Sequence, residues 1–449
     1  MNRKKEINPA RMLIFGYIAL ILSGTFLLSL PFATPRGINF IDALFTSTSA
    51  LCVTGLIVRD TATGFTVWGK LIILFLIQIG GLGYMTLSTT FFFFLGKKIS
   101  LRDRMLFKES VNVLSYENLM RFAWRIFRIT VIVELIGALL FYLCFRSRFP
   151  PLVAAGHALF HAVSAFCNAG FSTFSENLSL FHNLWAVPLI CAILIISGGI
   201  GFVVISDLYY LLIKNSRRGI SLHTKLALRT TLILIIVGMV FILVYEGNRS
   251  LAAYPLHLKV IHAFFQAVTP RTAGFNTVNI ANFAPFTLFL LMLFMFIGAS
   301  PGGTGGGVKT TTFAVVLIWV KELLLGRYKN GILIMKKKIP QEQVLRAFLL
   351  IALSFIVILF IFWILLLTNF GSPFKLLFEI ISAFGTVGLS LGSELNSVCS
   401  YAHDFSVCGK LLIIILMLTG RVGTLTIGSA LVRIHTVDFS YPEEHIVIG

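Results

Sequence analysis

The chain has 449 residues, of which 57% are hydrophobic and only 12% are charged. So few polar residues cannot cover the surface of a soluble protein of this length, and the composition therefore predicts an integral membrane protein. The formal net charge of +19 would suit a nucleic-acid partner. However, the basic residues gather in the segments that join the apolar stretches, which argues for a lipid bilayer and against nucleic acid.

Eight apolar stretches each reach or approach the roughly 20 residues that cross a bilayer as a helix. They are residues 12–30, 68–95, 129–145, 185–213, 226–245, 286–320, 348–367 and 410–432. The first follows Arg3, Lys4 and Lys5, as the apolar part of a signal peptide would, but it is too long for one and lacks a convincing cleavage site. We therefore expect an all-α polytopic membrane protein with eight spanning helices.

A shorter apolar segment lies between the two members of each pair of spans, and its length of about a dozen residues is typical of a re-entrant segment. In each segment a phenylalanine is followed ten residues later by a glycine: Phe45 and Gly55, Phe160 and Gly170, Phe264 and Gly274, Phe378 and Gly388. This spacing predicts four helix, pore loop, helix repeats around a pseudo-fourfold pore. We place the repeats at residues 1–98, 99–216, 217–338 and 339–449.

Each of these glycines closes a run of small residues that we expect to form a selectivity filter. The runs are Val53, Thr54, Gly55; Asn168, Ala169, Gly170; Thr272, Ala273, Gly274; and Thr386, Val387, Gly388. Non-helical backbone at membrane depth is tolerated where it lines a water-filled cavity, and a ring of carbonyl oxygens replaces the water shell of a monovalent cation. We therefore expect K+ at the filter carbonyls. Glycines that merely pack spans together are the alternative, but packing does not explain one offset in four copies.

A second glycine cluster follows each loop, in residues 80–83, 198–201, 298–307 and 420–423. The third cluster cannot stay a regular helix, given its proline and many glycines, and we expect a mobile gate there, with a structural kink as the alternative. The expected gate residues are Gly298, Ser300, Pro301, Gly302, Gly303, Thr304, Gly305, Gly306, Gly307, Lys309 and Arg421. The tract is not a P-loop, because Val308 separates the last glycine from the lysine.

Arg421 stands where the first two repeats have Gly81 and Gly199. A charge at that depth is costly and points to a functional role. We expect its guanidinium to donate to backbone carbonyls of the third glycine cluster and to add a positive barrier in the ion path. The alternative is an arginine buried against a carboxylate such as Glu134 or Asp207.

Other charged and reactive side chains lie near these segments. Lys309 either belongs to the gate or extends to the cytoplasmic interface, and Arg271, beside the third loop, is expected to point away from the ion path into the protein. Cys399 and Cys408 lie on a predicted outer loop and are candidates for a disulfide. Packing roles are expected for Cys52, Cys167, His157, His161 and His262.

Most of the 37 Lys and Arg lie on the terminal segments and on the connections between repeats. Examples are Lys97, Lys98, Arg102, Arg217, Arg218, Lys225, Lys336, Lys337 and Lys338. The positive-inside rule then places both termini and these connections in the cytoplasm, so the re-entrant segments enter from outside. A specific site for anionic lipid or a partner remains a less favoured explanation of the same charges.

In these motifs the chain resembles the Ktr/Trk/HKT superfamily of potassium translocating subunits. The resemblance rests on the four loops, the glycine-rich third inner helix and the arginine in the fourth, and the size and pattern are similar to the bacterial KtrB/KtrD type. It implies potassium uptake across the bacterial plasma (inner) membrane, an intramembrane gating loop at residues 298–310 and a homodimer. It also leaves room for Na+-dependent uptake.

The resemblance further implies a cytosolic regulatory ring of the KtrA/KtrC type that binds a nucleotide, so no cofactor is expected in this chain itself. Only a short tail follows Val432, so we expect regulation by a separate subunit that contacts the basic connections at residues 97–128 and 327–338 and the tail ending in Val447, Ile448 and Gly449. A sodium- or ammonium-permeable transporter is the alternative in transport. A membrane enzyme is disfavoured, because no nucleophile with a base, metal cluster or carboxylate pair is apparent.

Overall fold

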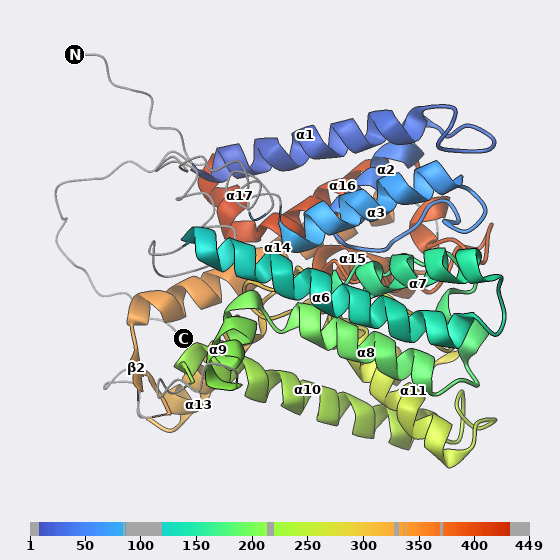
Figure 1. Cartoon of the computed structure of the whole chain (residues 1–449). Coiled ribbons are helices and arrows are strands. Elements are labelled where there is room, and N and C mark those ends of the chain that lie inside the picture. Colours follow the sequence, from blue (N-terminus) through green and yellow to red (C-terminus); the bar gives the residue numbers. More distant parts are fainter. Residues whose placement is uncertain are drawn as a thin grey trace, which may run out of the picture.

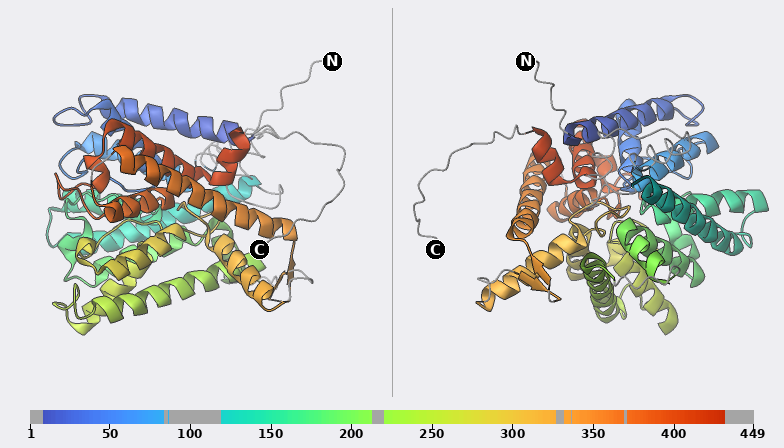
Figure 2. Two further views of the ribbon diagram at one scale, coloured as in Figure 1. Left: turned by 180° about the vertical axis from the view of Figure 1, so that it is seen from behind. Right: turned by 60° about the vertical axis from the view of Figure 1, so that its left-hand side comes forward.

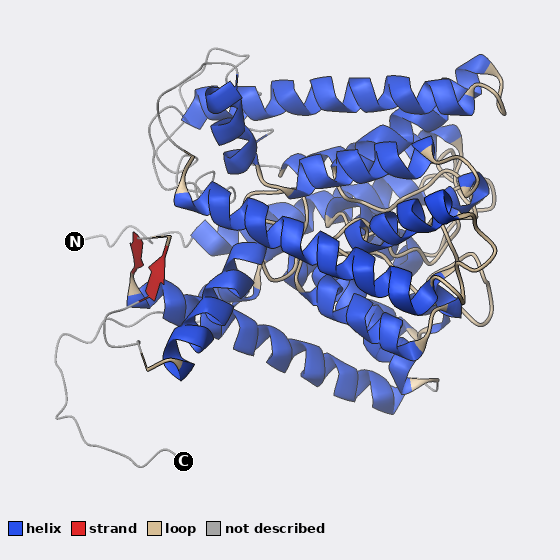
Figure 3. Ribbon diagram, turned by 90° about the horizontal axis from the view of Figure 1, so that it is seen from below, coloured by secondary structure: helices blue, strands red, loops and turns tan. Residues whose placement is uncertain are grey.

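The computed structural model describes residues 9–83, 86, 119–212, 220–326, 332–335, 337–368 and 371–431. Helices make up nearly all of its regular structure (Figure 1). One antiparallel hairpin, β1 (Ile332–Ile334) and β2 (Lys337–Ile339), is the only sheet in these ranges and is drawn in red in Figure 3. Apart from this hairpin, the predicted all-α architecture of pore-loop repeats is confirmed.

Each repeat begins with a long apolar helix. These helices are α1 (Pro9–Ser29), α6 (Leu119–Phe145), α10 (Leu222–Glu246) and α14 (Gln341–Thr368). Each is long and apolar enough to cross a membrane, and a helix suits lipid because it pairs its own backbone N–H and C=O groups. Their first turns lie at the same end of the molecule (Figure 1).

A short helix follows each long one and ends at a filter loop. These helices are α2 (Phe40–Leu51), α7 (Pro151–Phe166), α11 (Leu256–Val268) and α15 (Pro373–Gly385). With 12 to 16 residues they are too short to span, so they enter the membrane only part of the way. Proline begins α7 and α15, where its missing N–H would have no helical partner in any case.

The second long element of each repeat is broken at its glycine cluster. α3 (Val67–Leu82) ends at Gly83, while α8 (Ala186–Gly199) meets α9 (Phe202–Leu212) at 97° and α16 (Val407–Val422) meets α17 (Thr424–Leu431) at 100°. The glycines at the three breaks have positive φ, at +77° for Gly83, +100° for Gly201 and +97° for Gly423. Glycine adopts this conformation without the steric cost that a Cβ would bring.

In the third repeat the break is longer. α12 (Pro285–Phe296) is separated from α13 (Thr310–Leu324) by the glycine tract, here defined as residues 298–309. The described ranges therefore hold four helices that can span alone, or six if each bent pair counts as one span, rather than the eight expected. Residues 84–85 and 87–95 of the expected second span lie outside the described residues.

The repeats are arranged around a common centre, and the colours change in chain order around the molecule in the right-hand view of Figure 2. The phenylalanines of the Phe-to-Gly pattern are buried in three repeats, at Phe45, Phe160 and Phe378, but in the third Phe265 is buried in place of Phe264. The repeat boundaries stay predictions. Those at 98/99 and 216/217 lie outside the described residues, and that at 338/339 falls within β2.

Candidate functional site

The four filter loops share one backbone conformation. Two residues before each glycine the chain enters the left-handed region, at Val53 (φ 55°), Asn168 (60°), Thr272 (78°) and Thr386 (51°). The glycines are again left-handed, with φ of 90°, 70°, 73° and 89° in chain order. Non-glycine residues, above all β-branched ones, adopt positive φ only where the surrounding structure enforces it. The loops are therefore held in an uncommon shape by their neighbours.

A serine or threonine near the end of each short helix supplies that constraint, through its backbone carbonyl and its hydroxyl. The backbone carbonyls of Ser49, Ser164, Thr269 and Ser382 accept from the residue before the filter glycine, at 2.8, 2.7, 2.9 and 2.9 Å. The hydroxyls of the first three donate across the loop to the carbonyls of Leu56, Phe171 and Phe275, at 2.8, 2.8 and 2.7 Å. Ser382 instead accepts from Gly388 N at 3.1 Å.

Sequence reasoning missed these hydroxyl residues. A signal was present, since a serine precedes the filter glycine by six residues in three repeats, and Thr269 precedes its glycine by five. That one-residue difference matches the burial of Phe265 rather than Phe264 in the same repeat.

The four filter glycines form a closed ring. A Cβ placed on any filter glycine would lie close to the Cα of the filter glycine in the adjacent repeat. These distances are 3.1 Å from Gly55 to Gly170, 3.1 Å from Gly170 to Gly274, 3.1 Å from Gly274 to Gly388 and 2.9 Å from Gly388 to Gly55. Each such Cβ would also press on a backbone carbonyl oxygen of the next repeat. Neighbouring loops thus approach so closely that only glycine fits.

A cavity of about 660 Å³ opens above this ring and is lined by all four filter glycines. The rest of its lining is largely polar side chains and loop backbone, with the carboxylates Asp60 and Glu176. Among the described residues no lysine or arginine lines it. Carboxylates in a lining without basic side chains favour a cation in the cavity.

The glycine tract lies against the opposite side of the ring. Gly306 N donates to the hydroxyl of Thr386 at 2.9 Å, and a Cβ on Gly305 would overlap the side chain of Thr272. Both threonines are filter residues, so the tract directly contacts two of the four loops. A second cavity, of about 400 Å³, lies beyond the tract and is lined in part by Gly303, Gly305 and Gly307.

Backbone hydrogen bonds fasten the tract to the broken helices of two other repeats. Ser300 N donates to Gly199 O at 3.0 Å and Thr304 N to Gly198 O at 3.2 Å. On the other flank, Gly307 N donates to Gly420 O at 3.2 Å. The tract is thus a bridge across the axis between the second and fourth repeats.

Arg421 makes the contact expected of it. Its guanidinium donates to the backbone carbonyls of Thr304 in the tract and of Gly80 in the first repeat. The alternative carboxylate partners are bonded elsewhere: Glu134 to Gln78 at 3.2 Å, and Asp207 to Ser221 at 2.6 Å and Thr224 at 2.5 Å. The role of Arg421 in gating stays a prediction.

The structure places two other basic side chains, those of Lys309 and Arg271, in different surroundings. The ammonium of Lys309 donates to Gly305 O at 2.7 Å and Gly306 O at 3.3 Å, so it contacts the tract, and the alternative that it extends to the interface does not hold. Arg271 is buried, and its guanidinium donates to the Thr231 hydroxyl on α10 at 3.1 Å. It therefore bonds within the protein, as expected.

The cysteines and histidines of these regions are not assembled into a reactive site. All six cysteines are free thiols, so the candidate disulfide between Cys399 and Cys408 is not formed. Burial raises the pKa of the Cys399 thiol, on an outer loop, to about 11. Cys52 and Cys167 are buried, as expected of packing residues. The histidines bond to neighbouring hydroxyls, His157 to Thr173 at 2.6 Å, His161 to Ser172 at 3.0 Å and His262 to Thr277 at 3.0 Å.

The whole chain is similar to known cation transport proteins. A sequence model of the TrkH family, described as a cation transport protein, matches residues 9–440. The chain belongs to this family. The predicted resemblance to the Ktr/Trk superfamily is therefore confirmed, and the family is one of cation transporters rather than of enzymes.

Full-length relatives are similar to this member of the TrkH family. The Ktr system potassium uptake protein B of Bacillus subtilis is 37% identical over 99% of this chain and 97% of its own length. The potassium/sodium uptake protein NtpJ of Enterococcus hirae is 36% identical over 99% and 98%. The crystal structure of the potassium transporter TrkH from Vibrio parahaemolyticus has a TM-score of 0.72 at 21% identity, covering 96% of this chain and 87% of that one, and shares its fold.

Proposed function

We propose that this chain takes up K+ across the bacterial plasma membrane, through the ring formed by its four filter loops. The observation that carries the proposal is the closed ring of Gly55, Gly170, Gly274 and Gly388 beneath a negatively lined outer cavity. Backbone carbonyls gathered around one point replace the water shell of a dehydrated monovalent cation. The short helices point their partly negative C-terminal ends toward the same centre, which favours a cation there.

The glycine tract acts as the gate. It lies between the outer cavity above the ring and the second cavity of about 400 Å³ on the inner side. It bonds to the second and fourth repeats directly and is joined to the first through Arg421. Arg421 and Lys309 bring two positive charges to the path, and both donate to tract carbonyls. In this arrangement the tract blocks conduction, and the charges oppose a cation that reaches it. Opening requires the tract to leave the two filter threonines and the carbonyls that hold it.

Membrane orientation follows from charge. The end where α1, α6, α10 and α14 begin carries Arg11, Arg121, Arg125, Arg128, Lys225, Arg229 and Arg346 among the described residues. The opposite end carries a similar number of described basic residues, and the excess comes from the whole sequence, in which most of the 37 Lys and Arg lie on the terminal segments and the connections between repeats. With that excess, the positive-inside rule assigns this end and both termini to the cytoplasm and the outer cavity to the outside. Many of the basic residues used in the same prediction, including Lys97, Lys98, Arg102, Arg217, Arg218 and Lys336, lie outside the described residues.

Regulation comes from partners. The names of several relatives include the words Ktr system or Trk system, which supports a role as one component of a larger assembly. We assign to this chain a homodimer and a cytosolic ring of a KtrA/KtrC-type subunit that binds the nucleotide. Most of the proposed docking connections, and the tail residues Val447, Ile448 and Gly449, lie outside the described residues. Charge reversal across these connections should abolish co-purification with the ring.

The proposed function is tested with purified protein in liposomes. Uptake of radioactive rubidium, used as a substitute for K+, should be inhibited strongly by added K+ and weakly by added Na+. Liposomes without protein supply the background. Because one relative is named a potassium/sodium uptake protein, a second arm measures uptake with and without added Na+. Equal competition by K+ and Na+ would contradict a K+-selective ring. Absence of flux above background both in the unaltered protein and in Arg421→Ala, where the gate should open, would contradict transport by this chain alone.

A further inference from the structure

One of the four junctions in the filter ring differs from the others in its chain connection. The first three junctions join repeats that follow each other in the sequence, whereas the fourth repeat meets the first without a covalent link. The approach is nevertheless as tight, since a Cβ on Gly388 would lie 2.9 Å from the Cα of Gly55. Non-covalent contacts alone must therefore hold this junction.

At the outer mouth, the chain that leaves the first filter glycine is bonded to the fourth repeat. Ser400 N donates to Ile57 O at 2.9 Å, and Ile57 N donates to the Ser400 hydroxyl at 2.9 Å. His403 Nδ1 lies 3.0 Å from Val58 O. Ile57 is only two residues beyond Gly55, so these three bonds fix the chain almost at the ring itself.

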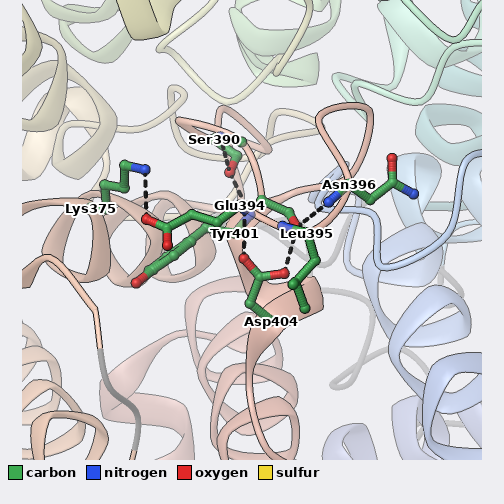
Figure 4. A network of polar contacts seen from close by, with 9 residues as sticks. Lys375, Ser390, Glu394, Leu395, Asn396, Tyr401 and Asp404 are labelled. Carbon is green, nitrogen blue, oxygen red and sulfur yellow. Dashed lines mark hydrogen bonds and ion pairs between the residues drawn. The ribbon is translucent and has the colours of Figure 1, made fainter.

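The loop that supplies Ser400 is itself firmly held (Figure 4). Asp404 accepts from the Ser393 hydroxyl at 2.5 Å and from Glu394 N at 2.7 Å, and the Ser390 hydroxyl accepts from Tyr401 N at 2.8 Å. These bonds close the outer loop of the fourth repeat on itself, so that it holds Ser400 in place.

Two further contacts tie this loop and its repeat to the short helices. The carboxylate of Glu379, wholly buried on α15, accepts from Ala402 N at 2.9 Å. The Lys410 ammonium on α16 pairs with the Asp42 carboxylate on α2 of the first repeat at 2.8 Å. The two side chains of this pair are 13% and 23% exposed, so water screens them less than a surface pair.

The other junctions have fewer polar contacts at the outer mouth. The first and second repeats share the bond from the Ser175 hydroxyl to Asp60 at 2.7 Å, and the second and third share that between His262 and His182 O at 3.0 Å. Between the third and fourth repeats the described residues show none there. The polar contacts are therefore concentrated where the covalent connection is missing.

We infer that Asp42, Ile57, Val58, Ser400, His403 and Lys410, here called the seam clasp, set the width of the filter ring where the fourth repeat meets the first, and so help to determine its preference for K+ over Na+. The inference rests on the proposed function. Small changes in the spacing of a carbonyl ring alter how well it replaces the water shell of one ion over another. With no peptide connection at this junction, loss of the clasp lets Gly388 and Gly55 move apart, whereas the other junctions stay linked.

The first test exchanges the charged pair. Asp42→Lys and Lys410→Asp are each expected to lower the ratio of rubidium to sodium uptake in liposomes roughly two- to fivefold, the range expected for one partly exposed ion pair. The double exchange should restore the ratio, because the pair is re-formed. Exchanging Glu342 and Arg346, an exposed ion pair within α14 at 2.6 Å, is the control and should leave the ratio unchanged.

The second test concerns the hydroxyl. Ser400→Ala leaves Ile57 N without its partner and should lower the ratio, while Ser400→Thr keeps the acceptor and should retain it. Ser250→Ala is the control, because that hydroxyl bonds only within the third repeat, to Glu246 at 2.8 Å and Asn282 O at 2.9 Å. Wild-type ratios in Asp42→Lys and Ser400→Ala, or no recovery in the double exchange, would overturn the inference. Absence of K+ selectivity in the unaltered protein would instead count against the proposed function.

Discussion

Arg421 of the fourth repeat donates a hydrogen bond to the backbone carbonyl of Thr304 in the third, and the same guanidinium reaches Gly80 of the first. One side chain thus joins the tract to a helix break on the far side of the axis. Buried carbonyls need partners, and here a fixed charge provides them. A single residue therefore holds the proposed closed state, and its substitution tests that state directly.

Replacing Arg421 should open the gate. Arg421→Ala removes contacts that the closed state has and the open state lacks, so flux in the absence of any partner should rise. A hydrogen bond to a charged group contributes about 1.5 to 3 kcal/mol, which corresponds to about one to two powers of ten in the closed-to-open ratio. Rubidium flux into liposomes measures the change. Reduced flux together with reduced protein yield would indicate an arginine needed for folding, and normal regulated flux after the tract is shortened would end the gate proposal.

A side chain at any of the four ring glycines should weaken selectivity. In Gly55→Ser, Gly170→Ser, Gly274→Ser or Gly388→Ser, the new Cβ meets backbone of the adjacent loop, and the positive φ adds strain. The preference for K+ over Na+ in competition assays is expected to fall in each variant. Gly37→Ser is the matched control, since that glycine also has positive φ, at 71°, but has no atom within 4 Å of its Cβ position. Unchanged competition in all four ring variants would remove the filter assignment.

The hydroxyls that hold the loops should affect both stability and selectivity. Ser164→Ala removes the bond to Phe171 O at 2.8 Å and should cost about 1 to 3 kcal/mol, since a buried carbonyl loses its partner. Ser197→Ala removes a bond of 2.7 Å to Ile193 O of its own helix, on an exposed face, and should change neither property. Thermal unfolding in detergent and ion competition measure the two effects. Equal behaviour of both variants would mean that Ser164 does not support the loop.

The glycine at the break of the fourth repeat should be required for folding. Gly420→Ala would place a methyl group on the backbone carbonyl of Phe384, at the end of α15, and such overpacking costs about 1 to 3 kcal/mol. In contrast, Gly428→Ala on α17 meets nothing within 4 Å and should be neutral or stabilise by up to about 1 kcal/mol, because alanine favours a helix. The melting temperature of Gly420→Ala should fall, whereas that of Gly428→Ala should stay unchanged or rise.

Thiol labelling should distinguish the two outer cysteines. Burial raises the pKa of Cys399 to about 11, so its reactive thiolate is scarce at neutral pH and becomes populated only as the pH approaches that value. Cys408 is exposed and should react with a maleimide without prior reduction. Peptide mass analysis after labelling at pH 7 should find the adduct on Cys408 only. Labelling of neither residue until a reductant is added would indicate a disulfide and contradict the structure.

The sequence alone determined the membrane class, the four repeats and the positions of the loops. Composition and spacing carry this information because a bilayer demands long apolar segments, and a loop of one shape needs glycine at one offset. The same logic placed Arg421 near backbone carbonyls, since a charge at that depth must find polar partners.

Only the tertiary structure decided how these parts meet. Contacts between residues of different repeats form the closed ring, the seam clasp and the approach of Gly305 and Gly306 to two filter threonines. The inward position of Lys309 depends on how the tract folds back within the third repeat. The sequence predicts continuous spans at residues 185–213 and 410–432, whereas the chain bends sharply at Gly201 and Gly423, because a glycine in a sequence pattern does not reveal its φ. Contacts between repeats depend on distances between chain segments far apart in sequence, and the residue pattern within one segment does not determine those distances.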